Sequence, residues 1–192
     1  MNLKKLFITG IPTAGKSYLA HKLANEVGGI AVSLDDFREK LAKNPDYKKW
    51  IDFYINKNEE EYLTQTSDED KWADLVAQSE GLWPAFLEEI KKYEKEEKLV
   101  IFESVNILPH LAKKDLDFTG IVLIGDSFEN ILKRNKQDPR WGNTEELQEL
   151  EAKTFFYTER PKYKSEAKKY GYEVFESADD GFPSLVANIM NN

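Results

Sequence analysis

The sequence predicts an α/β fold in which helices cover both faces of a parallel sheet. Short apolar runs alternate along the chain with stretches of helical periodicity. The first of these runs leads through a glycine-containing loop directly into a helical pattern. Parallel strands need crossover connections of this kind. We therefore expect one domain, residues 1–192, built on a doubly wound parallel sheet.

The loop after the first strand has the spacing of a phosphate-binding loop. It follows the apolar run at residues 6–8, and the pattern G-x-x-x-x-G-K-[ST] is matched from Gly10 to Ser17. Glycines let backbone amides surround a phosphate, and the helix N-terminus adds positive potential. We expect Lys16 to bridge the β- and γ-phosphates and Ser17 to ligate Mg²⁺. The predicted nucleotide-binding residues are Gly10, Ile11, Pro12, Thr13, Ala14, Gly15, Lys16, Ser17 and Tyr18.

Two acidic residues follow the second apolar run, residues 30–33. Asp35 and Asp36 open a helical pattern that extends through Leu41, and Arg38 lies one turn further along. Ligands of open α/β sheets bind at the carboxyl ends of the strands, so this pair is expected beside the phosphate loop. The alternative is that Asp35 only caps the helix.

Residues 43–98 are predicted to form a helical insertion between the second and third strands of the sheet. Large apolar residues recur in this segment at helical spacings. Its fifteen acidic residues and nine lysines account for −6 of the net charge of −8. Helix packing explains its many aromatic residues, but its position beside the acidic pair also suits it to cover a substrate.

The clearest buried strand is residues 99–102, which leads into Glu103. A carboxylate at the tip of a buried strand needs a partner, and Mg²⁺ or one of its waters is a natural one. A carboxylate facing solvent is the alternative. Another apolar run at residues 119–125 precedes a helix that is expected to begin near Ser127.

A basic segment interrupted by proline and glycine follows this helix. Its composition is typical of a mobile lid, residues 134–145, in which Arg134 and Arg140 close over transferring phosphate charge. A solvated helix end is the alternative. Residues 135–138 also spell the guanine-reading motif N-K-x-D of GTPases. That motif should follow a strand directly, whereas here a predicted helix precedes it.

The C-terminal part continues the alternation of helix and strand. A helical pattern at residues 144–169, with a break at Pro161, precedes a last strand at residues 172–175. A loop at residues 177–181 and a final helix at residues 182–190 are expected to follow.

Composition excludes several classes of protein. The chain is 41% hydrophobic and 32% charged, which is ordinary for a soluble domain, and no segment approaches the ~20 apolar residues that cross a bilayer. The absence of cysteine excludes disulfides and thiolate metal sites and is compatible with a cytoplasmic protein. A net charge of −8 argues against a long nucleic acid as a partner.

The motifs together resemble those of P-loop kinases, whose sheet is of the nucleoside-monophosphate-kinase type. ITGIPTAGKS and SLDDFR look like the phosphate loop and acceptor motif of polynucleotide 5′-kinases and of uridine kinases. VIFESVNILP is similar to the strand-end motif of uridine kinases and 2-phosphoglycerate kinases. It departs from that motif, with Ser104 in place of glycine and Asn106 in place of histidine.

The resemblance implies ATP and Mg²⁺ as cofactors. Asp35 would accept the proton of the acceptor hydroxyl or orient that hydroxyl, and Asp36 would assist the metal, although the sequence does not separate these two roles. Arg38 would hold a polar or anionic part of the acceptor, and Glu103 would act on Mg²⁺ through water. The lid arginines would stabilise the γ-phosphoryl group, with adenine between the lid helix and the loop at residues 177–181.

The resulting hypothesis is an ATP-dependent phosphotransferase that requires Mg²⁺. Its acceptor would be a hydroxyl of a small metabolite, a nucleoside or a nucleic-acid end. The acidic, aromatic insertion favours a neutral or weakly anionic small molecule over a polyanion. A GTPase or other NTPase remains one alternative, and a non-catalytic nucleotide-sensing protein whose insertion binds a partner is another.

Overall fold

A five-stranded, all-parallel sheet forms the centre of the computed structural model, which describes residues 4–54 and 56–190. The spatial order of the strands is β2-β3-β1-β4-β5. Their bounds are Lys5–Gly10 for β1, Ile30–Ser33 for β2, Val100–Glu103 for β3, Gly120–Leu123 for β4 and Glu173–Phe175 for β5. The predicted doubly wound α/β fold is confirmed.

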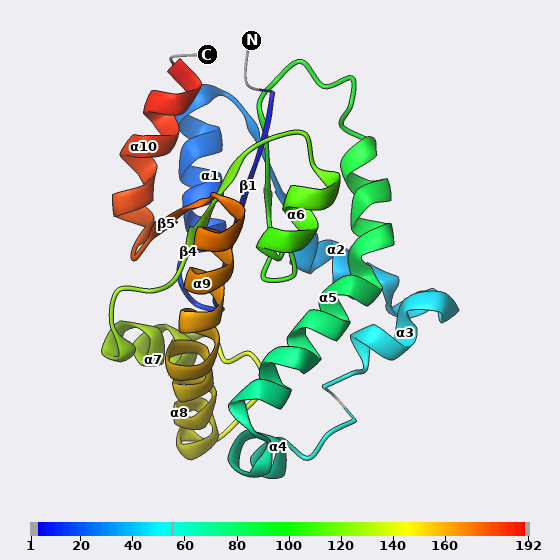
Figure 1. Ribbon diagram of the computed structural model, residues 1–192, viewed down its shortest axis with the longest axis vertical. Coiled ribbons are helices and arrows are strands. Elements are labelled where there is room, and N and C mark those ends of the chain that lie inside the picture. Colours follow the sequence, from blue (N-terminus) through cyan, green and yellow to red (C-terminus); the bar gives the residue numbers. More distant parts are fainter. Residues whose placement is uncertain (1–3, 55, 191–192) are drawn as a thin grey trace.

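Helices cover the sheet as the alternating pattern requires (Figure 1). Two pairs of helices pack together, α1 with α10 and α6 with α9. Their bounds are Lys16–Val27 for α1, Pro109–Asp115 for α6, Arg160–Tyr170 for α9 and Ala178–Met190 for α10. The last helix begins at Ala178, so the loop expected at residues 177–181 is mostly helical.

Most of the remaining helices lie towards the carboxyl ends of the strands, and α5 extends from there along the side of the sheet (Figure 1). From the second strand to the third these are α2 (Leu34–Lys40), a 3₁₀ turn (Leu41–Lys43), α3 (Pro45–Ile51), α4 (Glu59–Gln65) and α5 (Asp68–Lys91). After β4 come α7 (Phe128–Gln137), α8 (Glu145–Lys153) and the π-helical segment η2 (Thr154–Glu159). Residues 43–98 thus contain α3, α4 and α5, which lie in the chain between β2 and β3.

The break expected at Pro161 is wrong. Helix α8 continues through η2 into α9, and Pro161 lies in the first turn of α9. Proline is tolerated in a first turn because an N–H there often lacks an intrahelical partner. The change in helical winding occurs instead within η2.

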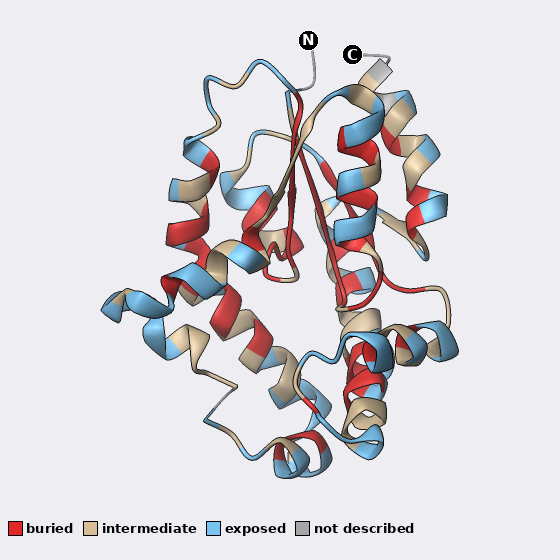
Figure 2. Cartoon of the chain, turned by 180° about the vertical axis from the view of Figure 1, so that it is seen from behind, coloured by how far each residue is buried: buried red, intermediate tan, exposed pale blue. Residues whose placement is uncertain are grey.

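The core is centred on β1, β3 and β4, the central strands, which are coloured as buried in Figure 2, whereas the edge strands β2 and β5 are only partly buried. Every residue of β3 and β4 is buried, as are Leu6, Phe7 and Ile8 of β1. Strands covered on both faces form continuous apolar runs, which is why these segments were recognisable in the sequence. Among the described residues, no helix is both long and apolar enough to cross a membrane.

Within the insertion, α3 packs closely on α5. Gly81 of α5 allows this approach, since a Cβ there would lie 2.1 Å from the Trp50 ring. Gln78 Nε2 also donates a hydrogen bond to the Trp50 carbonyl, at 2.9 Å.

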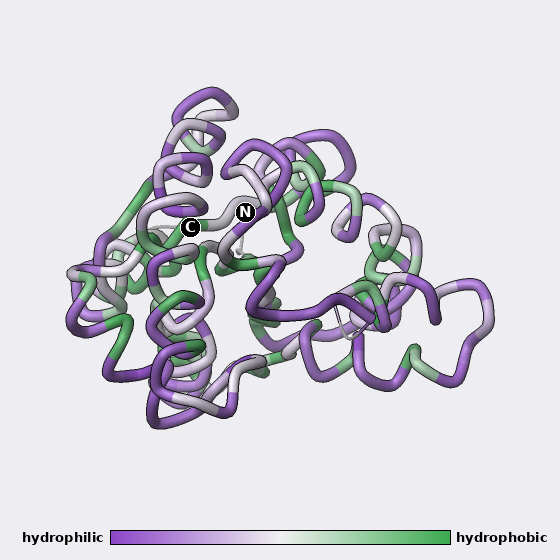
Figure 3. The backbone as a smooth tube through the Cα atoms, turned by 90° about the horizontal axis from the view of Figure 1, so that it is seen from below, coloured by the Kyte–Doolittle hydropathy of each residue, from purple (hydrophilic) through white to green (hydrophobic). Residues whose placement is uncertain are grey.

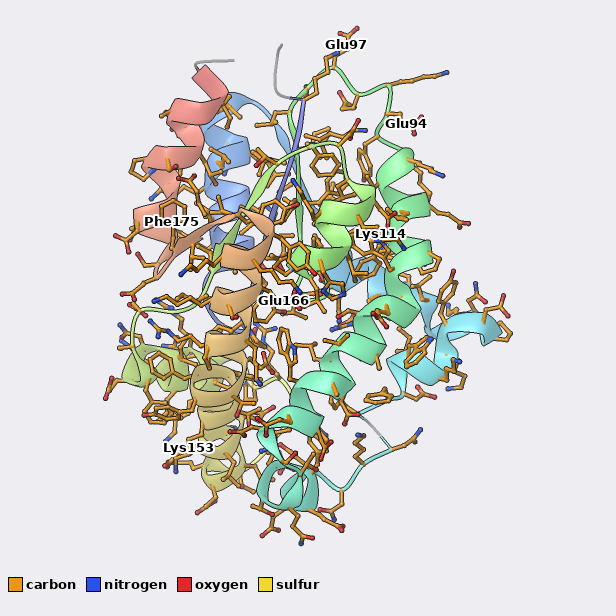
Figure 4. All side chains as sticks on the ribbon, viewed as in Figure 1. Glu94, Glu97, Lys114, Lys153, Glu166 and Phe175 are labelled. Carbon is orange, nitrogen blue, oxygen red and sulfur yellow. The ribbon has the colours of Figure 1, made fainter. Side chains whose placement is uncertain are left out.

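Hydrophilic residues predominate along the backbone in the end view of Figure 3. Figure 4 shows charged side chains, such as Lys153 of α8, directed away from the centre of the molecule. Glu166 instead lies at the contact of α9 with α6, where it bonds His110 at 3.0 Å.

Candidate active site

The phosphate loop lies where β1 ends against β4. Gly10 has φ 127°, and a Cβ at this position would come 1.8 Å from the Leu123 carbonyl oxygen. The next amide, Ile11 N–H, donates to that oxygen at 3.1 Å. The first glycine of the motif is therefore required by the close passage of the loop over β4.

Lys16 is buried beneath the loop, with 6% of its surface exposed. Its Nζ donates a hydrogen bond to the Ile11 carbonyl at 2.9 Å. Burial lowers the pKa of this ammonium group, and the carboxylates of Asp35 and Glu103 oppose that shift. The lysine is thus held at the loop with two acidic groups close to it.

A cleft of about 720 Å³ extends from the phosphate loop to the insertion. Most of the residues predicted for the site line it, namely Pro12, Thr13, Gly15, Lys16, Ser17, Tyr18, Asp35, Asp36, Arg38, Glu103, Arg134 and Arg140. Gly10, Ile11 and Ala14 do not appear in this lining. Ile11 and Ala14 have buried side chains, so these two are positioned to contribute backbone rather than side-chain groups.

Asp35 is oriented by a residue from the neighbouring strand. Its Oδ1 accepts a hydrogen bond from Ser104 Oγ at 2.6 Å. The helix is capped instead by Ser33, whose Oγ accepts from the Asp36 amide at 3.2 Å. The capping alternative for Asp35 is therefore wrong, and Asp35 lines the cleft instead.

Ser104 and Asn106 form a polar network at the carboxyl end of β3. Ser104 Oγ accepts from the Asn106 amide at 2.9 Å, and Asn106 Oδ1 accepts from Arg38 at 2.9 Å. Asn106 Nδ2 also donates to Ser79 of α5 at 2.8 Å. Ser104 and Asn106, which depart from the strand-end motif, thus connect α2 to α5 of the insertion.

Glu103 fits the role of a magnesium partner. It is 2% exposed, and its Oε2 has no hydrogen-bond partner among the described residues. Burial raises the pKa of this carboxyl, Asp35 adds to the shift, and Lys16 opposes it. The described residues contain no group of three His, Cys, Asp or Glu that could hold a metal alone. Mg²⁺ commonly uses one or two carboxylates together with substrate phosphates and waters, and a single buried carboxylate such as Glu103 fits that pattern.

The two predicted lid arginines have different surroundings. Arg134 donates to the Thr13 carbonyl at 3.3 Å, which places it directly on the phosphate loop. Arg140 is more exposed and contacts Asp138 at 3.3 Å. The adjacent Trp141 packs against Tyr54, with 6.0 Å between ring centroids, so the segment between α7 and α8 touches the insertion.

The N-K-x-D segment does not have the geometry of a base-reading motif. It straddles the end of α7, and Asn135 is fully buried. Asn135 Nδ2 donates to the Gln148 carbonyl at 2.9 Å and to Glu151 Oε2 at 3.0 Å. This side chain therefore joins α7 to α8 and does not face the carboxyl edge of the sheet.

Sequence reasoning did not identify Glu159 as a site residue. It is the last residue of η2 and lines the cleft, and its Oε2 is buried without a hydrogen-bond partner in the described part of the chain. Burial raises its pKa to about 8, opposed by Lys16. The spacing of apolar residues around position 159 does not indicate the π-helical segment in which Glu159 reaches the cleft.

No protein-family model matches the chain, and no curated protein matches it either. Solved structures do resemble it. Shikimate kinase from Acinetobacter baumannii in complex with shikimate has a TM-score of 0.55 at 16% identity, over 99% of this chain and 94% of that one. Deoxyadenosine kinase from M. mycoides with bound dATP has a TM-score of 0.53 at 18% identity, over 98% and 100% of the chains. The fold is therefore that of P-loop kinases.

Proposed function

We propose that this protein is an ATP-dependent phosphotransferase that transfers the γ-phosphoryl group to a hydroxyl of a small metabolite, nucleoside or nucleic-acid end. One observation carries the proposal: Asp35 is held by Ser104 in the same cleft as Lys16 and the phosphate loop. A carboxylate fixed beside a phosphate loop is suited to orient a hydroxyl and accept its proton. The kinases of similar fold support this assignment.

The residues of the cleft divide into two functional groups. On the nucleotide side, Lys16, Arg134 and the loop amides bind phosphate, while Ser17 and Glu103 hold Mg²⁺, which would supply charge neutralisation. On the acceptor side, Asp35 orients the hydroxyl. The insertion covers the acceptor, and residues 134–145 serve as the lid that brings Arg140 towards the phosphates.

The test compares the two acidic residues that the sequence does not separate. Asp35→Asn should lower kcat by about 10²- to 10⁴-fold, the typical contribution of a general base, and leave Mg²⁺·ATP binding by calorimetry within about twofold. Asp36→Asn should have a smaller effect on kcat, since Asp36 is exposed. Asp117→Asn, at an exposed position away from the cleft, is the matched control.

Turnover is measured as ADP release with and without a panel of hydroxyl acceptors. A kinase should release ADP slowly until its acceptor is added. Equal ADP release in the presence and absence of every acceptor would identify a hydrolase. Unchanged turnover in the Asp35→Asn variant would contradict the role of this carboxylate.

A further inference from the structure

Glu159 occupies a position that the proposed chemistry does not use. It ends the π-helical segment η2, between α8 and α9, and lines the cleft. Its Oε2 is buried and has no hydrogen-bond partner within residues 4–54 and 56–190. π-Helical turns are frequent at functional sites, and a buried carboxyl oxygen is costly to leave unpaired. Both features indicate that this oxygen binds a ligand.

The groups that face Glu159 leave its charge weakly compensated. Lys16 is the cation that favours its ionised form, while Tyr54 of the insertion and Tyr163 of α9 are the titratable groups beside it. The neighbouring Thr158 donates a hydrogen bond to Asp68 Oδ1 of α5 at 2.6 Å, which joins η2 to the insertion. If Lys16 turns to the phosphates of a bound nucleotide, Glu159 loses much of this compensation.

The other cations that line the cleft are Arg38, Lys71, Arg134 and Arg140. Arg38 donates to Asn106 Oδ1 at 2.9 Å, Lys71 Nζ donates to the Leu63 carbonyl at 2.8 Å, Arg134 donates to the Thr13 carbonyl at 3.3 Å, and Arg140 contacts Asp138 at 3.3 Å. None of the four forms an ion pair with Glu159 in the described part of the chain. Burial therefore keeps the pKa of Glu159 raised, and a cationic ligand is the partner that would favour its ionised form.

Aromatic rings of the insertion and of the lid line the same cleft. Tyr54 and Tyr62 lie 5.7 Å apart between ring centroids, and Trp141 lies 5.9 Å from Tyr62. Aromatic faces attract cations, and a neighbouring carboxylate adds to that attraction. Lys57 Nζ lies 4.4 Å from the Tyr62 ring centroid, but it pairs with Asp74 and is not among the residues that line the cleft.

We propose that the phosphoryl acceptor is an alcohol that also carries a cationic amine, and that Glu159 binds this amine beside Tyr54. The inference rests on the proposed function. In the reaction the bond from the γ-phosphorus to the β–γ bridging oxygen breaks, and a bond from the γ-phosphorus to the acceptor oxygen forms. The hydroxyl proton passes to Asp35, and the products are ADP and a phosphate ester. The ammonium group remains intact and serves only for binding.

The test uses matched pairs of alcohols that differ at one position, where one has an amine and the other a hydroxyl. The pairs are serinol and glycerol, glucosamine and glucose, and 3′-amino-3′-deoxyadenosine and adenosine. Transfer from radiolabelled ATP gives kcat/KM, and calorimetry on protein loaded with Mg²⁺ and a non-hydrolysable ATP analogue gives affinity. The variants are Glu159→Gln and, as a control, Glu149→Gln, which removes an exposed carboxylate of α8 outside the cleft.

The proposal predicts that in at least one pair the amine is preferred by about tenfold or more, as expected for a partly buried charge pair. Glu159→Gln should reduce that preference to less than about twofold, and Glu149→Gln should retain it. Because Glu159 must ionise to bind the amine, the wild type should also release a proton, detected as a binding heat that varies with the buffer.

The proposal is overturned if no amine exceeds its hydroxyl counterpart in transfer or in affinity, or if the preference survives in Glu159→Gln. These outcomes are distinct from failure of the proposed function. Amine-selective binding without phosphoryl transfer would retain the binding site and reject the kinase. Transfer to the hydroxyl compounds without amine preference would retain the kinase and reject the amine site.

Discussion

Replacing Glu159 by glutamine should make the protein more stable at alkaline pH and leave its stability nearly unchanged at acidic pH. The carboxyl has a folded-state pKa of about 8, raised by burial from an ordinary value of 4.5. Between these values the folded protein retains a proton that the unfolded chain releases. The contribution of the protonated Glu159 to the free energy of unfolding is present in full below pH 4.5 and is lost as the pH rises to about 8.

The magnitude follows from the size of the shift. Three pH units correspond to about 4 kcal/mol when one proton is fully released on unfolding. Partial ionisation at both ends of the range from pH 5 to pH 8 reduces the loss in unfolding free energy caused by Glu159 to about 3 to 4 kcal/mol. Glutamine does not titrate and avoids this loss. Glu103 and Glu151, whose pKa values are also raised, are present in both proteins, so to first order their contributions cancel in the difference.

The assay is urea unfolding of wild type and Glu159→Gln at pH 5, 6, 7 and 8, without nucleotide. The difference in unfolding free energy should grow steadily with pH and reach about 3 to 4 kcal/mol at pH 8. Glu149→Gln, which removes a surface carboxylate paired with Lys153, should show a small and nearly constant difference. A difference for Glu159→Gln that stays constant across this range would refute the assignment of a buried, uncompensated carboxyl.

Two further predictions concern the loop and the strand end. Gly10→Ala should destabilise the fold by about 3 kcal/mol or more in urea unfolding, because the added Cβ would clash with the Leu123 carbonyl. The control is Gly171→Ala, where nothing lies within 4 Å of the added Cβ and the positive φ alone should cost about 1 kcal/mol. Equal losses of unfolding free energy in the two variants would contradict the steric account. Ser104→Ala should lower kcat about tenfold without changing the KM for ATP, because Ser104 positions Asp35 by a hydrogen bond. The pH profile of kcat should also shift. If only the stability of the protein changes, the role of Ser104 is structural.

The fold was predictable because its signals are local. Each of these signals depends on residues adjacent in sequence: the apolar strands, the glycine loop and the N-cap of α7 at Ser127. All of them are present in the structure. The errors occurred where packing overrides local preference. Pro161 was expected to break a helix, but α8 continues through η2 into α9, and α9 packs against α6.

The candidate site was predictable only where it is built from motifs at the strand ends. Lys16, Asp35 and Glu103 belong to such motifs, and a parallel sheet brings strand ends together. The acceptor half is formed by residues distant in sequence, such as Gln78 and Glu159, which face the cleft only after the insertion has folded against the sheet. A glutamate in a charged helix has no sequence signal that separates a buried position from an exposed one.

The charges of the cleft argue for linkage between its two halves. Lys16 favours the ionised forms of both Glu103 and Glu159 while its Nζ is bonded to the Ile11 carbonyl. In the proposed complex a bound triphosphate competes for this ammonium group, so both carboxylates need new countercharges. Glu103 obtains one from the metal and Glu159 from the acceptor amine. Nucleotide binding should therefore strengthen acceptor binding, and by thermodynamic reciprocity the acceptor should strengthen nucleotide binding by the same factor, which titration of each ligand in the presence of the other measures directly.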